Sequence, residues 1–508
     1  MMKDELSLSE FSTSSTSSIA RLSAARKLVG YWNEARLRVA HAKAATVRAT
    51  PGVVPWRTAL EDVLKVGYGA QTQSRFVAGG WELIRWRTTP SAGALYPFEV
   101  IACVVGEGNY LWNVEKGMLA PCALPLLTPN DLAEAGIITP HGHRPEALLL
   151  LVARPWLSMK KYRLRGYSYC HLDVGHTATN LALYTSALGH APLVHLRFSR
   201  SILSERLRLD GLCREPLAVL SFASDGPDAD PGPGAGFEAA DLEIPGLEAP
   251  GEQEIQSWEE LRAYIASDSS LEPLDVPARE TLVAEPMDIP EEALVPLPIG
   301  RPGPSTAREW RSAILGRRSA KGFRDEPLTG AQIGELLQTL RTEGVAADCS
   351  PDDSVRLGVR LIARNVEGLS GVYAYSPRSH ALELIAERAE DPQPACMQQP
   401  IAGDAAALLI FHAPVCRLFG EQGYSAFAEL HFHAAQLAQR LHLSASRLGA
   451  AGMTCLGGFD DEECAALARL SGDEEAVYVI LLGVPDESAV KHDRLRVAFS
   501  HGFTTRED

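Results

Sequence analysis

One short segment of this chain combines small residues with a hydroxyl group, and it occurs only once. Residues 88–100 read TTPSAGALYPFEV and pass from small polar residues to an apolar run that predicts a strand. The small side chains of Ser91, Ala92 and Gly93 let the backbone approach another group closely, and they leave one hydroxyl and several amides for hydrogen bonds. An ordinary turn before a strand uses the same residue types, so this alternative stays open.

A second candidate site has the chemistry of an anion-binding site. Arg317, Arg318 and Ser319 bring two guanidinium groups and a hydroxyl to the predicted start of a helix, where free backbone N–H groups also suit a phosphate. A solvated basic surface is the alternative if these residues are taken alone.

Other polar groupings in the sequence are weaker. His141 and His143 lie in a Pro/Gly loop without further ligands at metal spacing. His431 and His433 would point to different sides of a helix, which argues against a shared metal. We therefore predict no metal site. The sequence also lacks the Gly-x-Ser-x-Gly motif that would indicate a hydrolase.

The composition limits the class of protein. Among 508 residues, 48 Lys and Arg stand against 64 Asp and Glu, and the net charge of −16 disfavours nucleic acid and anionic membranes as partners. Nine cysteines without a C-x-x-C pair indicate a reducing compartment. The N-terminus lacks the apolar segment of a signal peptide, and no apolar run is long enough to span a bilayer. We expect a cytoplasmic protein.

A change in composition divides the chain into two domains, which its length of 508 residues also favours. We expect an N-terminal tail and leading helix (1–50), a first domain (51–223), an acidic Pro/Gly-rich linker (224–304) and a second domain (305–508). Both domains contain an aromatic strand, an apolar strand closing on Pro, a Gly-Tyr-Ser step and a long helix ending in Leu-Gly, in that order. One α+β unit used twice explains this repeat.

Two helices can be placed within the repeat. The first covers residues 172–188 and is expected to bury one face, because a stripe of residues recurs at helical spacing. The stripe consists of Leu172, His176, Thr179, Leu183 and Ala187. Asp173 lies next to His176 on this helix, and we interpret the two as a packing or capping pair. Thr329-x-x-Gln332 has the spacing of a capping box and predicts the start of the second helix.

Several motifs in this order resemble the nitroreductase superfamily, specifically its SagB-type or McbC-like azoline dehydrogenases, with the thiopeptide type as a candidate subset. They are PSAGALYPFEV, KKYRLRGYSYCHLDVGHTATNLAL, RRSAKGFRDEPLTGAQIGELL, CLGGFDDEECAALARLSG and YVILLGVP. The resemblance covers most of residues 55–223 and 305–500. It implies an α+β fold in which two tandem nitroreductase-like, FMN-binding domains form an intramolecular pseudo-dimer.

Enzymes of this family bind FMN where two subunits meet, and the resemblance implies how this chain divides the task. Along the flavin ring would lie Pro90, Ser91, Ala92 and Gly93, a segment that the second domain lacks. The phosphate end would be held by second-domain residues: Arg317, Arg318, Ser319, Lys321, Gly457, Gly458, Lys491, Arg494 and Arg496. The first domain has no Arg-Arg-Ser. These complementary losses predict one FMN site per chain, built across both domains.

Azoline-oxidising members of the family carry a Lys-Tyr pair before the Gly-Tyr helix. This chain has Lys161 and Tyr162 there, whereas the second domain has Leu418 and Phe419. The lysine ammonium would lower the pKa of the tyrosine, so that one of the two residues takes the proton from the substrate Cα while hydride passes to FMN. A solvated basic turn is the alternative.

The resemblance implies an FMN-dependent two-electron oxidation of peptide thiazolines or oxazolines to thiazoles or oxazoles, in ribosomal peptide natural-product biosynthesis. The implied partners are an azoline-containing precursor peptide, a cyclodehydratase or another biosynthetic enzyme, and molecular oxygen as electron acceptor. Two alternatives stay open. One is another flavin-dependent oxidoreductase, such as a Cα–Cβ peptide or heterocycle dehydrogenase or an NAD(P)H-dependent reductase. The other is a non-catalytic scaffold that binds a peptide or a partner enzyme.

Overall fold

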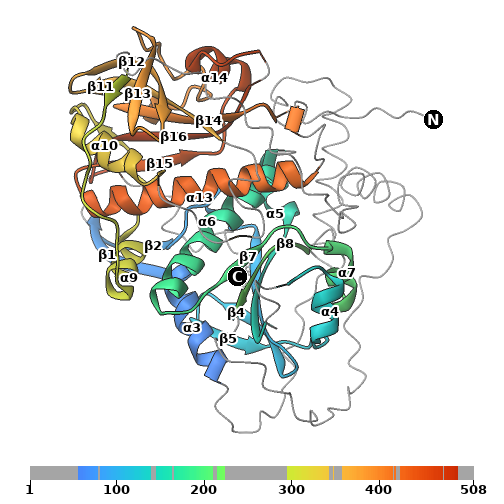
Figure 1. Ribbon diagram of the computed structural model, residues 1–508. Helices are drawn as coiled ribbons and strands as arrows, with labels where there is room; N and C mark the ends of the chain where they lie inside the picture. Colours follow the sequence, from blue (N-terminus) through green and yellow to red (C-terminus); the bar gives the residue numbers. More distant parts are fainter. Residues whose placement is uncertain are drawn as a thin grey trace.

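The computed structural model contains two sheet-based bodies that meet along a pair of long helices (Figure 1). It describes residues 55–77, 80–138, 145–162, 165–209, 214–222, 294–341, 347, 357–415, 417–418, 424–472 and 474–489. We call residues 55–222 the first half and residues 294–489 the second half. The expected N-terminal tail, most of the expected linker and the His141-x-His143 pair lie outside the described residues.

A six-stranded antiparallel sheet forms the body of the first half, in the order β5-β4-β3-β6-β8-β7. Its strands are β3 (Phe98–Val104), β4 (Gly108–Asn113), β5 (Met118–Pro121), β6 (Ala147–Ala153), β7 (Leu193–His195) and β8 (Glu215–Phe222). Every residue of β3, β6 and β8 is buried, as expected for continuous apolar runs that are covered on both faces.

An eight-stranded antiparallel sheet forms the body of the second half, in the order β10-β16-β14-β11-β12-β13-β9, with β15 also paired to β16. Its strands are β9 (Leu294–Pro296), β10 (Phe323–Arg324), β11 (Gly358–Val366), β12 (Leu369–Ser376), β13 (Ala381–Ala386), β14 (Ala407–Ala413), β15 (Gly452–Leu456) and β16 (Glu475–Pro485). The short β9 adds to the edge of β13, so the end of the segment expected to be linker takes part in the sheet.

The two sheets share one topology. Strands β11 to β16 follow the order of β3 to β8, so that each half repeats the same sequence of hairpins and crossovers. The repeated motifs therefore mark a repeated structure, and the expected α+β class is confirmed.

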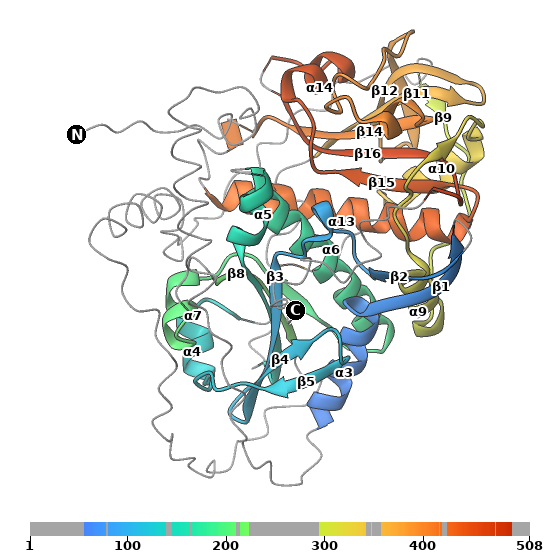
Figure 2. The same ribbon diagram turned by 180° about the vertical axis from the view of Figure 1, so that it is seen from behind.

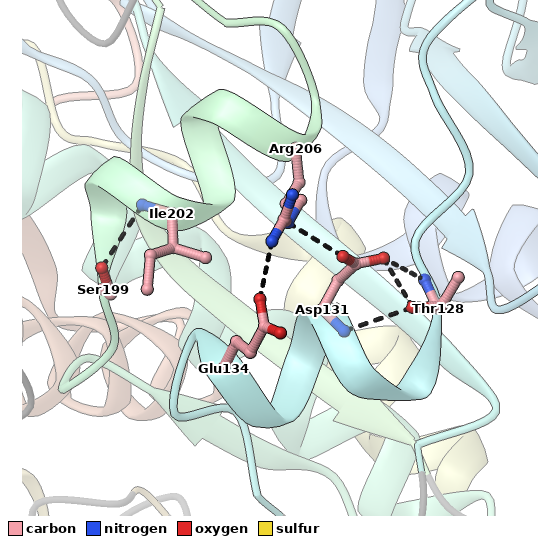
Figure 3. A network of polar contacts seen from close by, with 6 residues as sticks. All are labelled: Thr128, Asp131, Glu134, Ser199, Ile202 and Arg206. Carbon is pink, nitrogen blue, oxygen red and sulfur yellow. Dashed lines mark hydrogen bonds and ion pairs between the residues drawn. The ribbon is translucent and has the colours of Figure 1, made fainter.

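In both halves, short helices cover the outer face of the sheet. In the first half, Ile101 and Cys103 of β3 point to α4 (Pro129–Glu134) and α7 (Arg200–Arg206). Figure 3 shows how these helices are tied together, because Arg206 lies 2.9 Å from Asp131 and 2.7 Å from Glu134. In the second half, α11 (Pro400–Gly403) and α14 (Asp461–Ala468) pack on the corresponding face.

The inner faces of both sheets pack against the long helices α6 (Arg165–Ala187) and α13 (Tyr424–Leu448), which lie between the two bodies (Figures 1 and 2). The helices approach closely at Gly175, where an added Cβ would lie 2.7 Å from Ala435 Cβ. The expected stripe is buried at Leu172, His176 and Thr179, and burial extends around α6, since nearly all residues from Gly166 to Thr185 are buried. The second half covers the side that a single domain would leave in water.

Each half contributes helix residues to the hydrophobic core of the other half. Helix α9 (Ala307–Gly316) belongs to the second half, yet Ala313 and Ile314 are buried in the first-half core beside α3 (Pro55–Gly67). Conversely, Tyr167 and Leu172 of α6 are buried in the second-half core. This reciprocal packing joins the halves over apolar surfaces.

The remaining elements flank this arrangement. The hairpin β1 (Ala70–Val77) and β2 (Gly80–Arg87) leads to the short 3₁₀ turn η1 (Ala92–Ala94), and α5 (Pro155–Tyr162) precedes α6. Helix α10 (Gly330–Gln338) starts at Thr329 with reciprocal bonds to Gln332, so the predicted capping box is confirmed. Among the described residues, no helix combines the length and apolarity needed to cross a bilayer.

Candidate functional site

The Pro90–Gly93 segment forms a tight, partly open turn between β2 and β3. Gly93 is exposed, whereas Pro90, Ser91 and Ala92 are half-buried. The turn uses left-handed backbone conformations, with φ of 60° at Gly93, 56° at Ala94 and 46° at Tyr96. Such conformations are strained for residues other than glycine, so the surrounding structure must hold them.

Asp173 of α6 holds this turn from inside the molecule. Its Oδ2 accepts a hydrogen bond from Ser91 Oγ, and the backbone N–H of Ala92 also bonds to the carboxyl group. The side chain is buried, and this burial raises the pKa of Asp173 to about 8 against the opposing effects of those bonds and of Arg87. The expected pairing of Asp173 with His176 is wrong, because His176 bonds instead to Gln439 and Tyr478.

The backbone position of Arg317 differs from the sequence expectation. Arg317 caps the end of α9 rather than starting a helix, and its N–H bonds to the carbonyl of Ile314. The start of this helix is at Thr306, whose capping box with Glu309 resembles that of Thr329 and Gln332. A helix C-terminus carries partial negative charge, so the helix dipole does not favour an anion there. Any phosphate at this position depends on the side chains.

Arg317 links the two halves at the base of the Pro90–Gly93 turn. Its guanidinium is buried and donates from Nε to the carbonyl of Thr88 at 2.7 Å and from Nη2 to the carbonyl of Arg87 at 2.8 Å. A third bond runs from Nη1 to Ser319 Oγ at 3.2 Å. The arginine thus fixes the chain just before the turn, and Nη1 is the nitrogen that faces the neighbouring hydroxyl.

The other basic and hydroxyl residues of this segment are more accessible. Arg318 is exposed, and its guanidinium lies over the ring of Trp86 at 4.4 Å from the centroid. Ser319 and Lys321 are half-buried. The predicted basic residues Lys491, Arg494 and Arg496 lie outside the described part of the chain.

The glycine turn of the second half packs against the Pro90–Gly93 segment. A Cβ added at Gly457 would lie 3.3 Å from Ala92 Cβ and 3.0 Å from Tyr169 Cζ, so a side chain at this position would be crowded. Tyr169 Oη donates to the Gly457 carbonyl. Arg165 extends the contact, because it donates to the carbonyl of Phe459 at 2.5 Å. A Cβ at Gly458 would meet Met397 Sδ at 3.3 Å.

Lys161 and Tyr162 are the last residues of α5, directly before α6. The side chain of Lys161 lies outside the described part of the chain. Tyr162 is half-buried, and its ring packs edge-on against Tyr169 with 5.0 Å between the centroids. Because Tyr169 touches Gly457, and Gly457 touches Ala92, Tyr162 lies beside the same group of residues.

The symmetry-related position between the two halves is built from different residues. His171 faces His431 across the α6–α13 contact, and Gly175 faces Ala435. The same separation in residue number relates Tyr169 to Glu429, so Glu429 occupies the position that corresponds to Tyr169. Where the second half has Gly457-Gly458, the first half has Leu196-Arg197, followed in both cases by Phe and a helix N-cap. Arg197 makes a bidentate ion pair with Glu429, at 2.6 Å and 3.0 Å.

Sequence patterns did not assign Tyr169, Arg165 and Trp86 to this region, and they predicted a different partner for Asp173. Asp173 stands between apolar residues in the run CHLDVGH, and a carboxyl group there signals either a buried partner or a polar site. Its partner Ser91 is far away in the sequence, so no local spacing could identify the pair.

Comparison with known proteins places this arrangement in a known fold. A crystal structure of a protein from Anabaena variabilis, named as a nitroreductase, superposes with a TM-score of 0.65. The superposition covers 86% of this chain and 90% of that chain at 20% sequence identity. The chain has the nitroreductase fold. Residues 314–484 also match the model of the nitroreductase family, so the second half carries the family's sequence pattern.

Two relatives match parts of the nitroreductase-fold chain. MJ1384 of Methanocaldococcus jannaschii, a nitroreductase by name, is 30% identical over 135 residues, which are 26% of this chain and 63% of the relative. The microcin B17-processing protein McbC of Escherichia coli is 26% identical over 145 residues, 27% of this chain and 53% of the relative. The chain therefore spans less than two thirds of the length of either relative.

The residues gathered between the halves of this nitroreductase fold suit a flat ring with a phosphate tail. The exposed Gly93 and its half-buried neighbours offer backbone without bulky side chains. Arg318, Ser319 and Lys321 supply donors for a phosphate, and they follow the arginine that is bonded to the base of the same turn. This donor set fits FMN.

Proposed function

We propose that the chain is an FMN-dependent oxidoreductase that dehydrogenates azoline rings in a peptide. The observation that carries this proposal is the convergence of the Pro90–Gly93 turn, the Arg317–Lys321 segment and the Gly457 turn from two different halves. The similarity to McbC, the microcin B17-processing protein, supports a peptide substrate. An azoline-containing precursor peptide and a cyclodehydratase or other enzyme of its biosynthesis are the proposed partners, with molecular oxygen as final electron acceptor.

The proposal gives each half of the chain its own task in holding FMN. Ser91, Ala92 and Gly93 would lie against the flavin ring, since their small side chains let the ring approach the backbone amides. Arg318, Ser319 and Lys321 would hold the phosphate, with Nη1 of Arg317 beside them. FMN, when bound, supplies the acceptor for the hydride that leaves the azoline ring.

Tyr162 and Lys161 are the proposed bases. Dehydrogenation removes one proton and one hydride from adjacent carbons of the azoline ring, and the proton leaves the carbon that was the Cα of the cyclised residue. A tyrosine needs a cationic neighbour to ionise near neutral pH, and Lys161 precedes Tyr162 directly. The half-buried ring of Tyr162 beside Tyr169 places this group next to the glycine turn.

Two measurements test the function. The purified protein is expected to be yellow and to release FMN, and incubation with a thiazoline-containing peptide is expected to lower the mass of the peptide by about 2 Da, the loss of a hydride and a proton. Colourless protein that does not take up added FMN contradicts any flavin-dependent activity and favours a scaffold that binds a peptide or partner.

The match to the nitroreductase-named MJ1384 favours a second candidate, an NAD(P)H-dependent reductase. This candidate predicts a bound flavin that NAD(P)H bleaches, with turnover of a nitroaromatic or quinone substrate. An unchanged thiazoline peptide together with rapid NAD(P)H-dependent bleaching would select the reductase.

A further inference from the structure

A buried carboxyl group stands directly behind the Pro90–Gly93 turn. Asp173 lies in the middle of α6, and its side chain accepts hydrogen bonds from Ser91 Oγ and from the backbone of Ala92. Ser91 Oγ in turn accepts a bond from the N–H of Tyr96 at 2.8 Å. A continuous chain of bonds therefore runs from α6 through Ser91 to the far end of the turn.

This chain of bonds spans the strained part of the backbone. Between Ser91 and Tyr96, residues Gly93, Ala94 and Tyr96 all have positive φ, and two of these residues carry side chains. A turn of this kind keeps its shape only if its ends are held, because the unbonded segment would relax to a common conformation. The bonds from Asp173 to Ser91 and Ala92 hold one end, and the Ser91–Tyr96 bond holds the other.

The other half of the chain supplies an internal comparison. His433 is the residue of the second half that corresponds to Asp173. The two are separated by the same number of residues as the facing pairs His171–His431 and Gly175–Ala435. His433 is also buried, but it is a base, and the second half has no Pro-Ser-Ala-Gly segment. At this pair of related positions, the carboxyl group stands in the half that has the turn, and an imidazole stands in the other half.

We propose that Asp173 is a positioning residue that fixes Ser91, Ala92 and Gly93 in the conformation that receives the FMN ring. The inference rests on the proposed function for its ligand, but the positioning of the turn can be measured without one. Asp173 acts through Ser91 and Ala92 and is not assigned a chemical step.

The surroundings of Asp173 indicate the form in which it acts. The guanidinium of Arg87 lies near it, together with Tyr68, which follows α3, Cys170 of α6, Cys455 of β15 and Tyr478 of β16. Burial outweighs the hydrogen bonds from Ser91 and Ala92 and the charge of Arg87 and raises the pKa of Asp173 to about 8, which favours the protonated carboxyl at neutral pH. Asparagine matches a protonated aspartate in shape and keeps the acceptor oxygen, so Asp173→Asn should preserve the turn.

The test compares FMN affinities by fluorescence titration of the flavin-free, full-length protein. We expect Asp173→Ala to weaken FMN binding by about tenfold or more, as for the loss of one well-made buried hydrogen bond. Asp173→Asn should stay close to wild type, and Ser91→Ala should weaken binding as Asp173→Ala does. His433→Ala is the matched control, because it removes a buried polar side chain at the symmetry-related position and should leave the affinity unchanged.

A ligand-independent measurement separates this inference from the proposed function. Amide hydrogen exchange at Ala92 and Tyr96 is expected to accelerate in Asp173→Ala and Ser91→Ala but not in Asp173→Asn or His433→Ala. If wild type binds no FMN, the proposed function fails while the exchange data still decide the role of Asp173. Unchanged exchange and unchanged FMN affinity in both Asp173→Ala and Ser91→Ala would overturn the inference.

Discussion

At the scale of single residues, several polar groups at the candidate site bond to the other half of the chain. Arg317 of the second half bonds to the carbonyls of Arg87 and Thr88, whereas Tyr169 of the first half bonds to the carbonyl of Gly457. Lysine could not replace Arg317, because a single ammonium cannot direct two donors at adjacent carbonyls in a fixed plane. The shape of the site therefore depends on side chains that cross between the halves.

Tyr162 supplies the residue-scale test of the proposed chemistry. We expect Tyr162→Phe to lower kcat for azoline oxidation by about 100-fold or more, the usual contribution of a positioned base. The bound FMN should remain, because the phenol oxygen is not among the groups proposed to hold it. Lys161→Ala should behave in the same way if the ammonium sustains the ionised tyrosine.

Tyr184 offers a matched control for this experiment. Its hydroxyl bonds to Asp62 at 3.0 Å, on the side of α6 that faces α3 and α9. Tyr184→Phe should leave kcat unchanged, and full activity in both Tyr162→Phe and Lys161→Ala would remove these residues from the mechanism.

At the scale of elements, the central pair of α6 and α13 carries an unusual number of buried histidines. Burial lowers the pKa of all five: His171, His176, His431, His433 and His442. These imidazoles are neutral in the fold, so the helix pair that joins the halves should weaken when they become charged.

The pH dependence of stability tests this property at His431. Burial lowers the pKa of His431 to about 4 from the ordinary value of 6.5, with His171 and Arg165 of α6 nearby. Its contribution to stability is complete above pH 6.5 and is lost as the pH falls towards 4, by up to about 1.4 kcal/mol per pH unit. Urea unfolding between pH 7.5 and 5 should therefore show a shallower pH dependence for His431→Phe than for wild type, and parallel curves would contradict the assignment.

The elements also show what the sequence could and could not predict. The repeated order of motifs and the Thr329–Gln332 capping box were sufficient for the repeated sheet and for α10, because both depend on local patterns. The prediction that Arg317 starts a helix is wrong, because the capping box of Thr306 and Glu309 starts α9 earlier and Arg317 lies at its end. The burial of α6 on all sides and the Asp173–Ser91 bond depend on contacts between distant segments, which no local spacing encodes.

At the scale of the whole molecule, the two halves share a topology but differ at the two symmetry-related positions between them. One position holds the Pro90–Gly93 turn, Tyr169 and the glycine turn. The other holds the ion pair of Arg197 with the buried Glu429. A single FMN per chain follows from the proposed function, since the sequence of the second half has no Pro-Ser-Ala-Gly segment and the first half has Leu196-Arg197 in place of the two glycines.

The Arg197–Glu429 pair gives a prediction about stability. Arg197→Ala should lower the free energy of unfolding by about 1–3 kcal/mol, because Glu429 would keep a buried charge without its cation. Chemical unfolding measures this loss, while the FMN content per chain should stay the same.

The exposed ion pairs of Arg206 in Figure 3 provide the comparison. Arg206→Ala should have a much smaller effect than Arg197→Ala, because water screens exposed charges. Equal losses of unfolding free energy in the two variants would show that the Arg197–Glu429 pair stabilises the fold no more than an exposed ion pair does.

The joining of both halves in one chain has a consequence for dilution. A site formed between separate subunits disappears when the protein concentration falls below their dissociation constant. In this chain, the turn at Ser91 and the arginine at position 317 belong to the same molecule, so their encounter is intramolecular. The contacts between the two halves at the candidate site therefore do not depend on the protein concentration.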